Sequence, residues 1–184
     1  MLVTTTISAD DFLVDIANNE GIDTFRFDPV LGRNDVLGAY SEAAQKYQYD
    51  YMIRVTADCP FVDGQSLDLV LAQAQAMDNF DLLTTKPSFP HGIDYEICPV
   101  SLLTRINQQA ESDEEREHIF NYIYNREEQF EIVRVSPPPE LLFADNFFLD
   151  TAEDYRSLTS MLDGEADLFI TPQEIVAKLK KYDH

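Results

Sequence analysis

The sequence is poor in the features that would place a protein outside the cell or in a membrane. It contains only two cysteines, Cys59 and Cys98, which are far apart and form no CxxC pattern. The N-terminal stretch MLVTTTISADD lacks the basic start of a secretory signal, and no run approaches the ~18 consecutive apolar residues of a membrane-spanning helix. Two scattered thiols in a chain without a signal are typical of a reduced protein. We therefore expect a cytoplasmic protein without disulfides.

Basic residues are also scarce. Lys and Arg number 13 against 34 Asp and Glu, which gives a formal net charge of −21 and a pI near 4.2. Such a field repels phosphate backbones, so we expect neither nucleic acid nor an anionic membrane surface as a partner. A triphosphate would have to approach through a bound cation or a local basic loop, and the sequence has no evident basic loop.

The composition is that of a folded globular domain. The 184 residues include 45% apolar and 11% aromatic residues, enough for one full hydrophobic core. No internal repeat, low-complexity tract or linker divides the sequence. We therefore expect a single domain over residues 1–184.

Segments with strand patterns alternate with segments of helical periodicity. We expect strands at 2–6, 23–27, 50–57, 81–86, 130–136 and 147–150, and helices at 10–19, 34–47, 64–77, 112–124, from 151 and from 171. The segment 87–98 carries Pro and Gly and then alternates, which indicates a loop entering a strand or hairpin. This alternation predicts an α/β fold with a mostly parallel sheet covered on both faces.

Capping residues mark several of the expected helix starts. The N-cap candidates are Asn34 or Asp35, Ser112 with Glu115 three residues later, and Thr171 with Glu174. Short polar side chains at these positions accept hydrogen bonds from the first free N–H groups of a helix, and Pro172 suits the first helical turn.

Two aspartates stand at the ends of expected strands. Asp58 follows the segment 50–57 within VTADCPFVDG, where Pro60 restricts the backbone, and Asp150 ends the segment 147–150. Ligands of open α/β sheets bind outside the carboxyl ends of the strands. Mg²⁺ takes one or two carboxylates and completes its shell with waters and substrate phosphates. The alternative is that Asp58 only closes a turn and that Asp150 only favours the dipole of the following helix.

Five blocks of sequence follow one another in a recognisable order. They are GRNDVLGAYSEAA (32–44), RVTADCPFVD (54–63), HGIDYEI (91–97), REHIFNYIY (116–124) and LDTAEDY (149–155). In this order they resemble the cytidylyltransferases of the spore-coat polysaccharide type, relatives of the CMP-KDO and CMP-sialic acid synthetases. The resemblance covers residues 1–162 and leaves 163–184 as a C-terminal helical tail. It implies a three-layer, Rossmann-like nucleotide-diphospho-sugar transferase fold.

The resemblance also implies an activity and a set of catalytic residues. Members of the family join the α-phosphate of CTP to a hydroxyl of a sugar or sugar acid, release pyrophosphate and require Mg²⁺. Asp58 and Asp150 match the aspartates that hold the metal and act in catalysis. Arg116 is expected as a further catalytic residue, because its guanidinium offers a bidentate fork to a phosphate or a sugar carboxylate.

Other positions are expected to bind substrate. Asp94 and Glu96 match the D-x-E strand near the sugar; the alternative is an edge strand whose polar face lies in solvent. The remaining candidates are Arg33 and Asn34, for the base or ribose, and His118 at the start of the 116–124 block. Arg54 is as well suited to an internal ion pair. His91 stands where relatives are expected to carry an acidic residue, and a lone loop histidine is more often structural or merely exposed.

The sequence departs from the family at its start. Family members begin with a strand and a basic, Gly-rich loop, broadly Q-A-R-x-G-S-x-R-L-P-x-K, whose amides and cations cradle the CTP phosphates. This sequence begins at LVTTT, which resembles the second strand of the family. We therefore expect an N-terminally truncated fold with an exposed sheet edge, covered in a homodimer or by association with a missing N-terminal half.

Three functions remain open from the sequence. The first is a cytidylyltransferase or a degenerate relative of one. The second is a non-catalytic partner subunit or half-enzyme that assembles with a chain supplying the CTP loop. The third, a Mg²⁺-dependent hydrolase, lacks an evident nucleophile, because the neighbouring Asp58 carboxylate would raise the pKa of Cys59 rather than activate its thiol.

Overall fold

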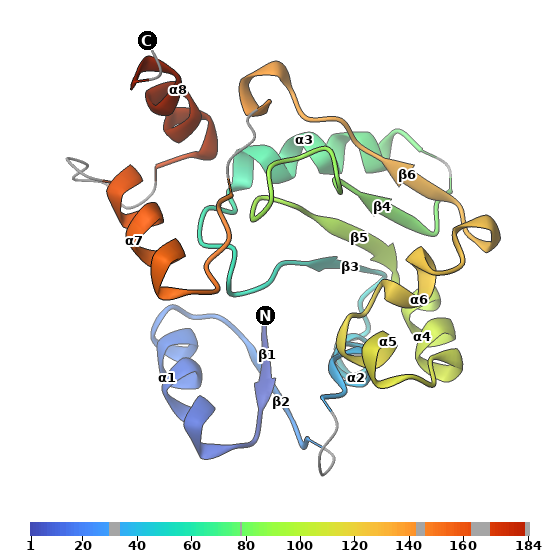
Figure 1. Ribbon diagram of the computed structural model, residues 1–184. Coiled ribbons are helices and arrows are strands. Elements are labelled where there is room, and N and C mark those ends of the chain that lie inside the picture. Colours follow the sequence, from blue (N-terminus) through green and yellow to red (C-terminus); the bar gives the residue numbers. More distant parts are fainter. Residues whose placement is uncertain (30–33, 78, 143–145, 163–169, 183–184) are drawn as a thin grey trace. The chain divides into compact units, whose positions relative to one another are not determined.

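The computed structural model describes residues 1–29, 34–77, 79–142, 146–162 and 170–182 (Figure 1). Its contacts divide the chain into two compact units. Unit 1 comprises Met1–Met52 and Cys98–Phe130, and unit 2 comprises Ile53–Ile97 and Glu131–His184. None of the described helices is long and apolar enough to cross a membrane.

Unit 1 opens with two parallel strands and the helix that connects them. β1 (Leu2–Thr5) pairs in parallel with β2 (Thr24–Phe27), and η1 (Ser8–Asp10) and α1 (Asp11–Asn19) lie between them in sequence. Gly21 follows α1 with a φ of 69°. This left-handed conformation suits glycine, and it confirms the expected end of the helix.

The other helices of unit 1 pack around α2 (Val36–Tyr47), which contacts α4 (Val100–Gln109) and α5 (Asp113–Glu117). Two further short helices, α6 (Asn121–Tyr124) and η2 (Glu127–Gln129), complete this unit. Asp35 caps α2, because its Oδ1 accepts a hydrogen bond of 2.9 Å from the Gly38 N–H. Apolar side chains of these helices and of the segment before α6 are buried: Leu37, Ala43, Ala44, Leu102, Leu103, Ile106, Ile119, Phe120 and Ile123.

The second sheet has the strand order β3-β5-β4-β6. Its strands are β3 (Tyr51–Arg54), β4 (Leu82–Thr84), β5 (Glu96–Pro99) and β6 (Ile132–Arg134). β4 runs parallel to β6 and antiparallel to β5. The expected α/β class is therefore confirmed, with β5 antiparallel to its neighbour β4 inside the sheet.

Unit 2 has its own hydrophobic core. α3 (Gly64–Gln75) runs beside β4 and β5 in Figure 1, and η3 (Pro139–Leu141), α7 (Ala152–Met161) and α8 (Pro172–Tyr182) follow β6 in sequence. The start of α3 is capped by Asp63, whose Oδ1 accepts hydrogen bonds from two N–H groups of its first turn. One buried cluster draws on all these elements: Phe61, Val70, Leu83, Phe89, Ile93, Tyr95, Ile97, Val135, Leu141, Phe147, Leu158, Ile175 and Val176.

Several expected elements differ in the structure. β3 ends at Arg54 rather than at residue 57, so Asp58 lies in a turn beyond the strand. The segment 147–150 is extended but is not a strand, because its amides bond to loops rather than to a neighbouring strand. The expected helix 112–124 is two helices, since His118 at the end of α5 has a ψ of 85°, which is not helical. α4 was not predicted.

Candidate functional site

Three segments of unit 2 are tied together by backbone hydrogen bonds. The Leu149 N–H donates to the Asp58 carbonyl at 2.8 Å, and the Phe147 N–H donates to the His91 carbonyl at 2.8 Å. Gly92 has a φ of 94°, and a Cβ at this position would lie 2.6 Å from the Phe148 nitrogen. Only glycine lets the backbones approach this closely. The turn after β3, the loop before β5 and the segment before α7 therefore meet at one place.

The structure brings the two predicted metal ligands into adjoining segments. Asp58 is half-buried, and Asp150 is exposed and directly follows the Leu149 amide that binds the Asp58 backbone. The Asp58 carboxylate accepts a weak hydrogen bond from the Cys59 thiol, with Sγ 3.6 Å from Oδ1. Within the described part of the chain, neither aspartate forms an ion pair. Their role as metal ligands stays a prediction.

The donor set suits a cation that is shared with a substrate. The described residues contain no group of three or more His, Cys, Asp or Glu side chains that could hold a metal ion by themselves. Two carboxylates without neutralising cations match the way Mg²⁺ is held by one or two protein oxygens, with waters and phosphates as its other ligands. Asp58 and Asp150 therefore fit Mg²⁺ as a partner of a phosphate-bearing substrate, and do not form a closed metal cage.

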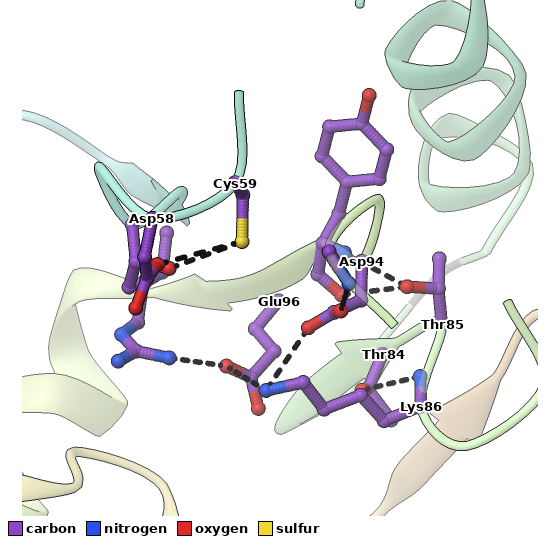
Figure 2. Close-up of polar contacts among 11 residues, drawn as sticks. Asp58, Cys59, Thr84, Thr85, Lys86, Asp94 and Glu96 are labelled. Atoms are coloured by element: carbon purple, nitrogen blue, oxygen red, sulfur yellow. Dashed lines mark hydrogen bonds and ion pairs between the residues drawn. The ribbon is translucent and has the colours of Figure 1, made fainter. Parts of the chain in front are cut away.

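A second pair of carboxylates lies on the same side of β5 and is neutralised (Figure 2). The Lys86 Nζ lies 3.1 Å from the Asp94 Oδ2 and 3.4 Å from the Glu96 Oε2. The Arg54 Nη1 lies 3.0 Å from the same Glu96 oxygen. The Glu96 side chain is only 4% exposed. The alternative of a polar face in solvent is therefore wrong for Glu96, which is a buried carboxylate held between two cations.

Arg54 and Lys86 make the burial of Glu96 possible. A buried carboxylate is costly unless it is paired and hydrogen-bonded, and two cations supply that compensation here. The Nε of Arg54 is buried and has no hydrogen-bond partner among the described residues. Asp94 is fixed from its other side as well, because its Oδ1 accepts a hydrogen bond of 3.0 Å from the Gly92 N–H. These contacts set the position of the Asp94 carboxylate firmly.

Cys59 stands beside Asp58 but is not an activated thiol. Burial is the largest cause that raises the pKa of Cys59, to about 11, and the negative charges of Asp58 and Asp94 raise it further. The hydrogen bond with Thr56 acts in the opposite direction. The expected effect of Asp58 on this thiol is therefore confirmed, although burial contributes more than the carboxylate does.

The remaining predicted site residues belong to unit 1 or lie outside the described residues. Arg116 donates through Nε and Nη2 to Asp35, at 2.8 Å each, and through Nη1 and Nη2 to Asn107 and the Ala110 carbonyl. All five of its N–H groups are thus engaged. The Asn34 Nδ2 donates to Glu117 at 3.1 Å.

Arg116 therefore has the contacts of a structural ion pair, which do not favour its assignment as a substrate ligand. His118 is exposed at the end of α5. Arg33 lies outside the described residues. The assignments of Asn34, Arg116, His118 and Arg33 stay predictions.

Sequence reasoning missed the part that Lys86 plays and the partner of His91. Lys86 could have been found, because Asp94 and Glu96 alternate along one strand and therefore share a side on which they need a common cation. The exposed His91 ring stacks on the Phe148 ring, with centroids 4.8 Å apart and planes 16° apart. No local signal relates these two residues, since they lie in segments far apart in the sequence.

Sequence comparison finds relatives among known proteins. No family model matches the sequence. The chain is 29% identical over 161 residues to an uncharacterised protein of Methanocaldococcus jannaschii, a match over 85% of this chain and 63% of that protein. It is 30% identical over 164 residues to the spore coat polysaccharide biosynthesis protein SpsF of Bacillus subtilis, over 88% of this chain and 65% of SpsF. The chain thus spans less than two thirds of the length of both relatives.

Structural comparison points to the same group. The fold is similar to that of a cytidylyltransferase from Leptospira borgpetersenii serovar Hardjo-bovis, with a TM-score of 0.85, 28% sequence identity, and a match over 98% of this chain and 75% of that one. The chain therefore has the Rossmann-like α/β fold of a nucleotide-sugar cytidylyltransferase. With the similarity to SpsF, this confirms the resemblance to the cytidylyltransferases of the spore-coat polysaccharide type.

Proposed function

We propose that this chain acts in sugar-nucleotide biosynthesis as a Mg²⁺-dependent cytidylyltransferase domain that binds CTP and a sugar or sugar acid. The similarity to a cytidylyltransferase and to SpsF supports the reaction class. The observation that carries the proposal is the placement of Asp58 and Asp150. Their segments are joined by the Leu149–Asp58 backbone bond, while their carboxylates have no ion-pair partner among the described residues.

The contacts of each residue in unit 2 suggest a separate role for it in the reaction. Asp58 and Asp150 would hold the Mg²⁺, which supplies positive charge to the phosphates when bound. Asp94 would accept a hydrogen bond from a sugar hydroxyl, because Lys86 and the Gly92 N–H hold its carboxylate in place. Glu96, buried between Arg54 and Lys86, would position these two cations.

A second candidate function is that of a partner subunit that binds nucleotide only together with another chain, either a second copy or a different protein. The observation in its favour is that the nearby basic side chains already have carboxylate partners. Arg54 and Lys86, the basic residues among these carboxylates, are both engaged in ion pairs. With a net charge of −21, the charge of a triphosphate would then have to be compensated in part by another chain.

Calorimetric titration of CTP into the protein separates these two functions. With Mg²⁺ we expect binding that disappears in EDTA and in Asp58→Ala and Asp150→Ala, but persists in Asp15→Ala, which removes an exposed carboxylate of α1. Binding that survives EDTA or Asp58→Ala would contradict the proposed metal site. No binding by the wild-type chain with millimolar CTP and Mg²⁺ would instead favour the partner subunit.

A further inference from the structure

An aromatic pair stands at the junction of the segments that carry the predicted site. His91 is exposed, Phe148 is half-buried, and their rings stack with centroids 4.8 Å apart. Phe148 covers one face of the imidazole, and His91 is nevertheless exposed to solvent. A planar, exposed ring with its back supported by a second ring is a surface for a flat or gently curved ligand.

The backbone fixes this pair on both sides. The Phe147 N–H donates to the His91 carbonyl. This hydrogen bond ties the backbone of His91 to the residue that directly precedes Phe148. Gly92 lies against the Phe147–Phe148 peptide, and the Gly92 N–H donates to the Asp94 carboxylate at 3.0 Å. The pair is therefore anchored by the same turn that positions Asp94, and its Phe148 lies two residues before Asp150 in the chain.

We infer that His91, supported by Phe148, is a sugar-binding wall against which the apolar face of a pyranose ring lies while Asp94 accepts hydrogen bonds from its hydroxyls. This inference rests on the proposed function, since it assumes a sugar substrate. A pyranose has one face made largely of C–H bonds and an edge of hydroxyls. An aromatic ring and a fixed carboxylate that are carried by the same turn complement both of these surfaces. Binding sites combine such an apolar wall with a few placed polar groups.

His91 is the contact residue of this wall, and Phe148 is a positioning residue that acts through it. The ring of His91 should therefore be replaceable by another aromatic ring but not by a small side chain. His91→Phe keeps a planar ring, whereas His91→Ala removes the wall. Phe148→Ala removes the support of the ring, and Phe148→Tyr restores it.

Saturation-transfer-difference NMR tests the inference on the full chain without metal or nucleotide. The probes are methyl β-D-glucopyranoside, methyl β-D-glucuronide and methyl N-acetyl-β-D-glucosaminide, with cytidine as a comparison. We expect at least one pyranoside to receive saturation, strongest on the axial protons of one ring face. His91→Ala and Phe148→Ala should weaken its binding roughly three- to tenfold, the size of an aromatic contact. His91→Phe, Phe148→Tyr and the control Tyr155→Ala, an exposed aromatic of α7, should bind as wild type does.

The outcomes distinguish this inference from the proposed function. Loss of the sugar signal in His91→Ala, with CTP binding intact, supports the wall. A sugar signal from none of the three probes, or one unchanged in His91→Ala, overturns it. If His91→Ala instead weakens the cytidine signal alone, the ring contacts the base and the inference is wrong. The chain could also bind the sugar through His91 but bind no CTP. This outcome would support the sugar-binding wall and contradict the proposed cytidylyl transfer.

Discussion

The two units of the chain use their charged side chains in different ways. In unit 1, Arg116 has engaged every N–H group of its guanidinium with Asp35, Asn107 and a carbonyl oxygen. In unit 2, a backbone hydrogen bond joins the segments of Asp58 and Asp150, and neither carboxylate has an ion-pair partner among the described residues. All three residues stand in blocks that resemble the same family. The comparison teaches that a residue in such a block can bind a ligand only where the fold leaves its charge and its hydrogen-bonding groups without partners in the protein.

The largest expected effect is on binding at unit 2. Asp58→Ala and Asp150→Ala should each weaken Mg²⁺-dependent CTP binding by about a hundredfold or more, because each removes a proposed metal ligand. The free energy of unfolding without ligand should stay within about 0.5 kcal/mol of wild type, as for a surface substitution. Calorimetry and urea titration measure the two quantities. A large loss of stability in Asp58→Ala would erase the contrast with unit 1.

The second largest effect is expected on the stability of unit 1. Arg116→Ala removes one partner of a half-buried, bidentate ion pair and leaves Asp35 uncompensated, so we expect a loss of about 3 kcal/mol in the free energy of unfolding. Urea titration of Arg116→Ala, Asp35→Ala and the double variant gives the coupling between the two side chains. CTP binding lost at unchanged stability would restore Arg116 as a substrate ligand and break the comparison.

A smaller effect should follow from the close approach at Gly92. Gly92→Ala places a Cβ against the Phe147–Phe148 peptide at a positive φ, and we expect a loss of about 2 kcal/mol in stability together with weaker CTP binding. Gly21→Ala is the matched control. Gly21 also has a positive φ but no atom within 4 Å of the added Cβ, so the strain should cost only about 1 kcal/mol. Equal losses in both variants would show that the approach of the segments is unimportant.

The smallest effect is expected at Thr151, a residue next to the proposed site whose hydrogen-bonding groups already cap a helix. Thr151 follows Asp150 and caps α7, with its Oγ1 accepting from the Asp154 N–H at 3.2 Å and its own N–H donating to Asp154 at 2.7 Å. Thr151→Ala should cost about 1 kcal/mol in thermal or urea unfolding and leave the CTP affinity unchanged. A loss of affinity larger than the loss of stability would mean that Thr151 contacts the ligand directly.

Local sequence predicted the parts of the fold that depend on a few neighbouring residues. The cap at Asp35 and the start of α8 at Thr171 form as expected. At Ser112 only half of the expected capping box forms, because the Glu115 carboxylate pairs with Arg126. The segments of Asp58 and Asp150 meet as expected, but through a loop contact, because 147–150 is not a strand and β3 ends before Asp58. The end of β3 at Arg54 was harder to foresee, since the apolar pattern continues beyond the last ladder bond.

What the sequence could not supply is the identity of distant partners. The bonding of Arg116 to Asp35 and of the Phe147 amide to the His91 carbonyl depends on how the chain folds back on itself. The segment 147–150 has a strand-like composition, but its amides find loop carbonyls instead. Contacts of this kind join residues that are far apart in the sequence, so no local pattern indicates them.

The Leu149–Asp58 hydrogen bond has a consequence for the dynamics of unit 2. Any ligand that bridges Asp58 and Asp150 adds a second link between two segments that this amide already joins, so it stabilises their closed arrangement in proportion to its occupancy. Opening of the segment before α7 would then require release of the ligand as well. The Leu149 amide should therefore exchange its hydrogen more slowly when ligand is bound, whereas the amides of β1 in unit 1 keep their rate. A single backbone proton would report the occupancy of the site.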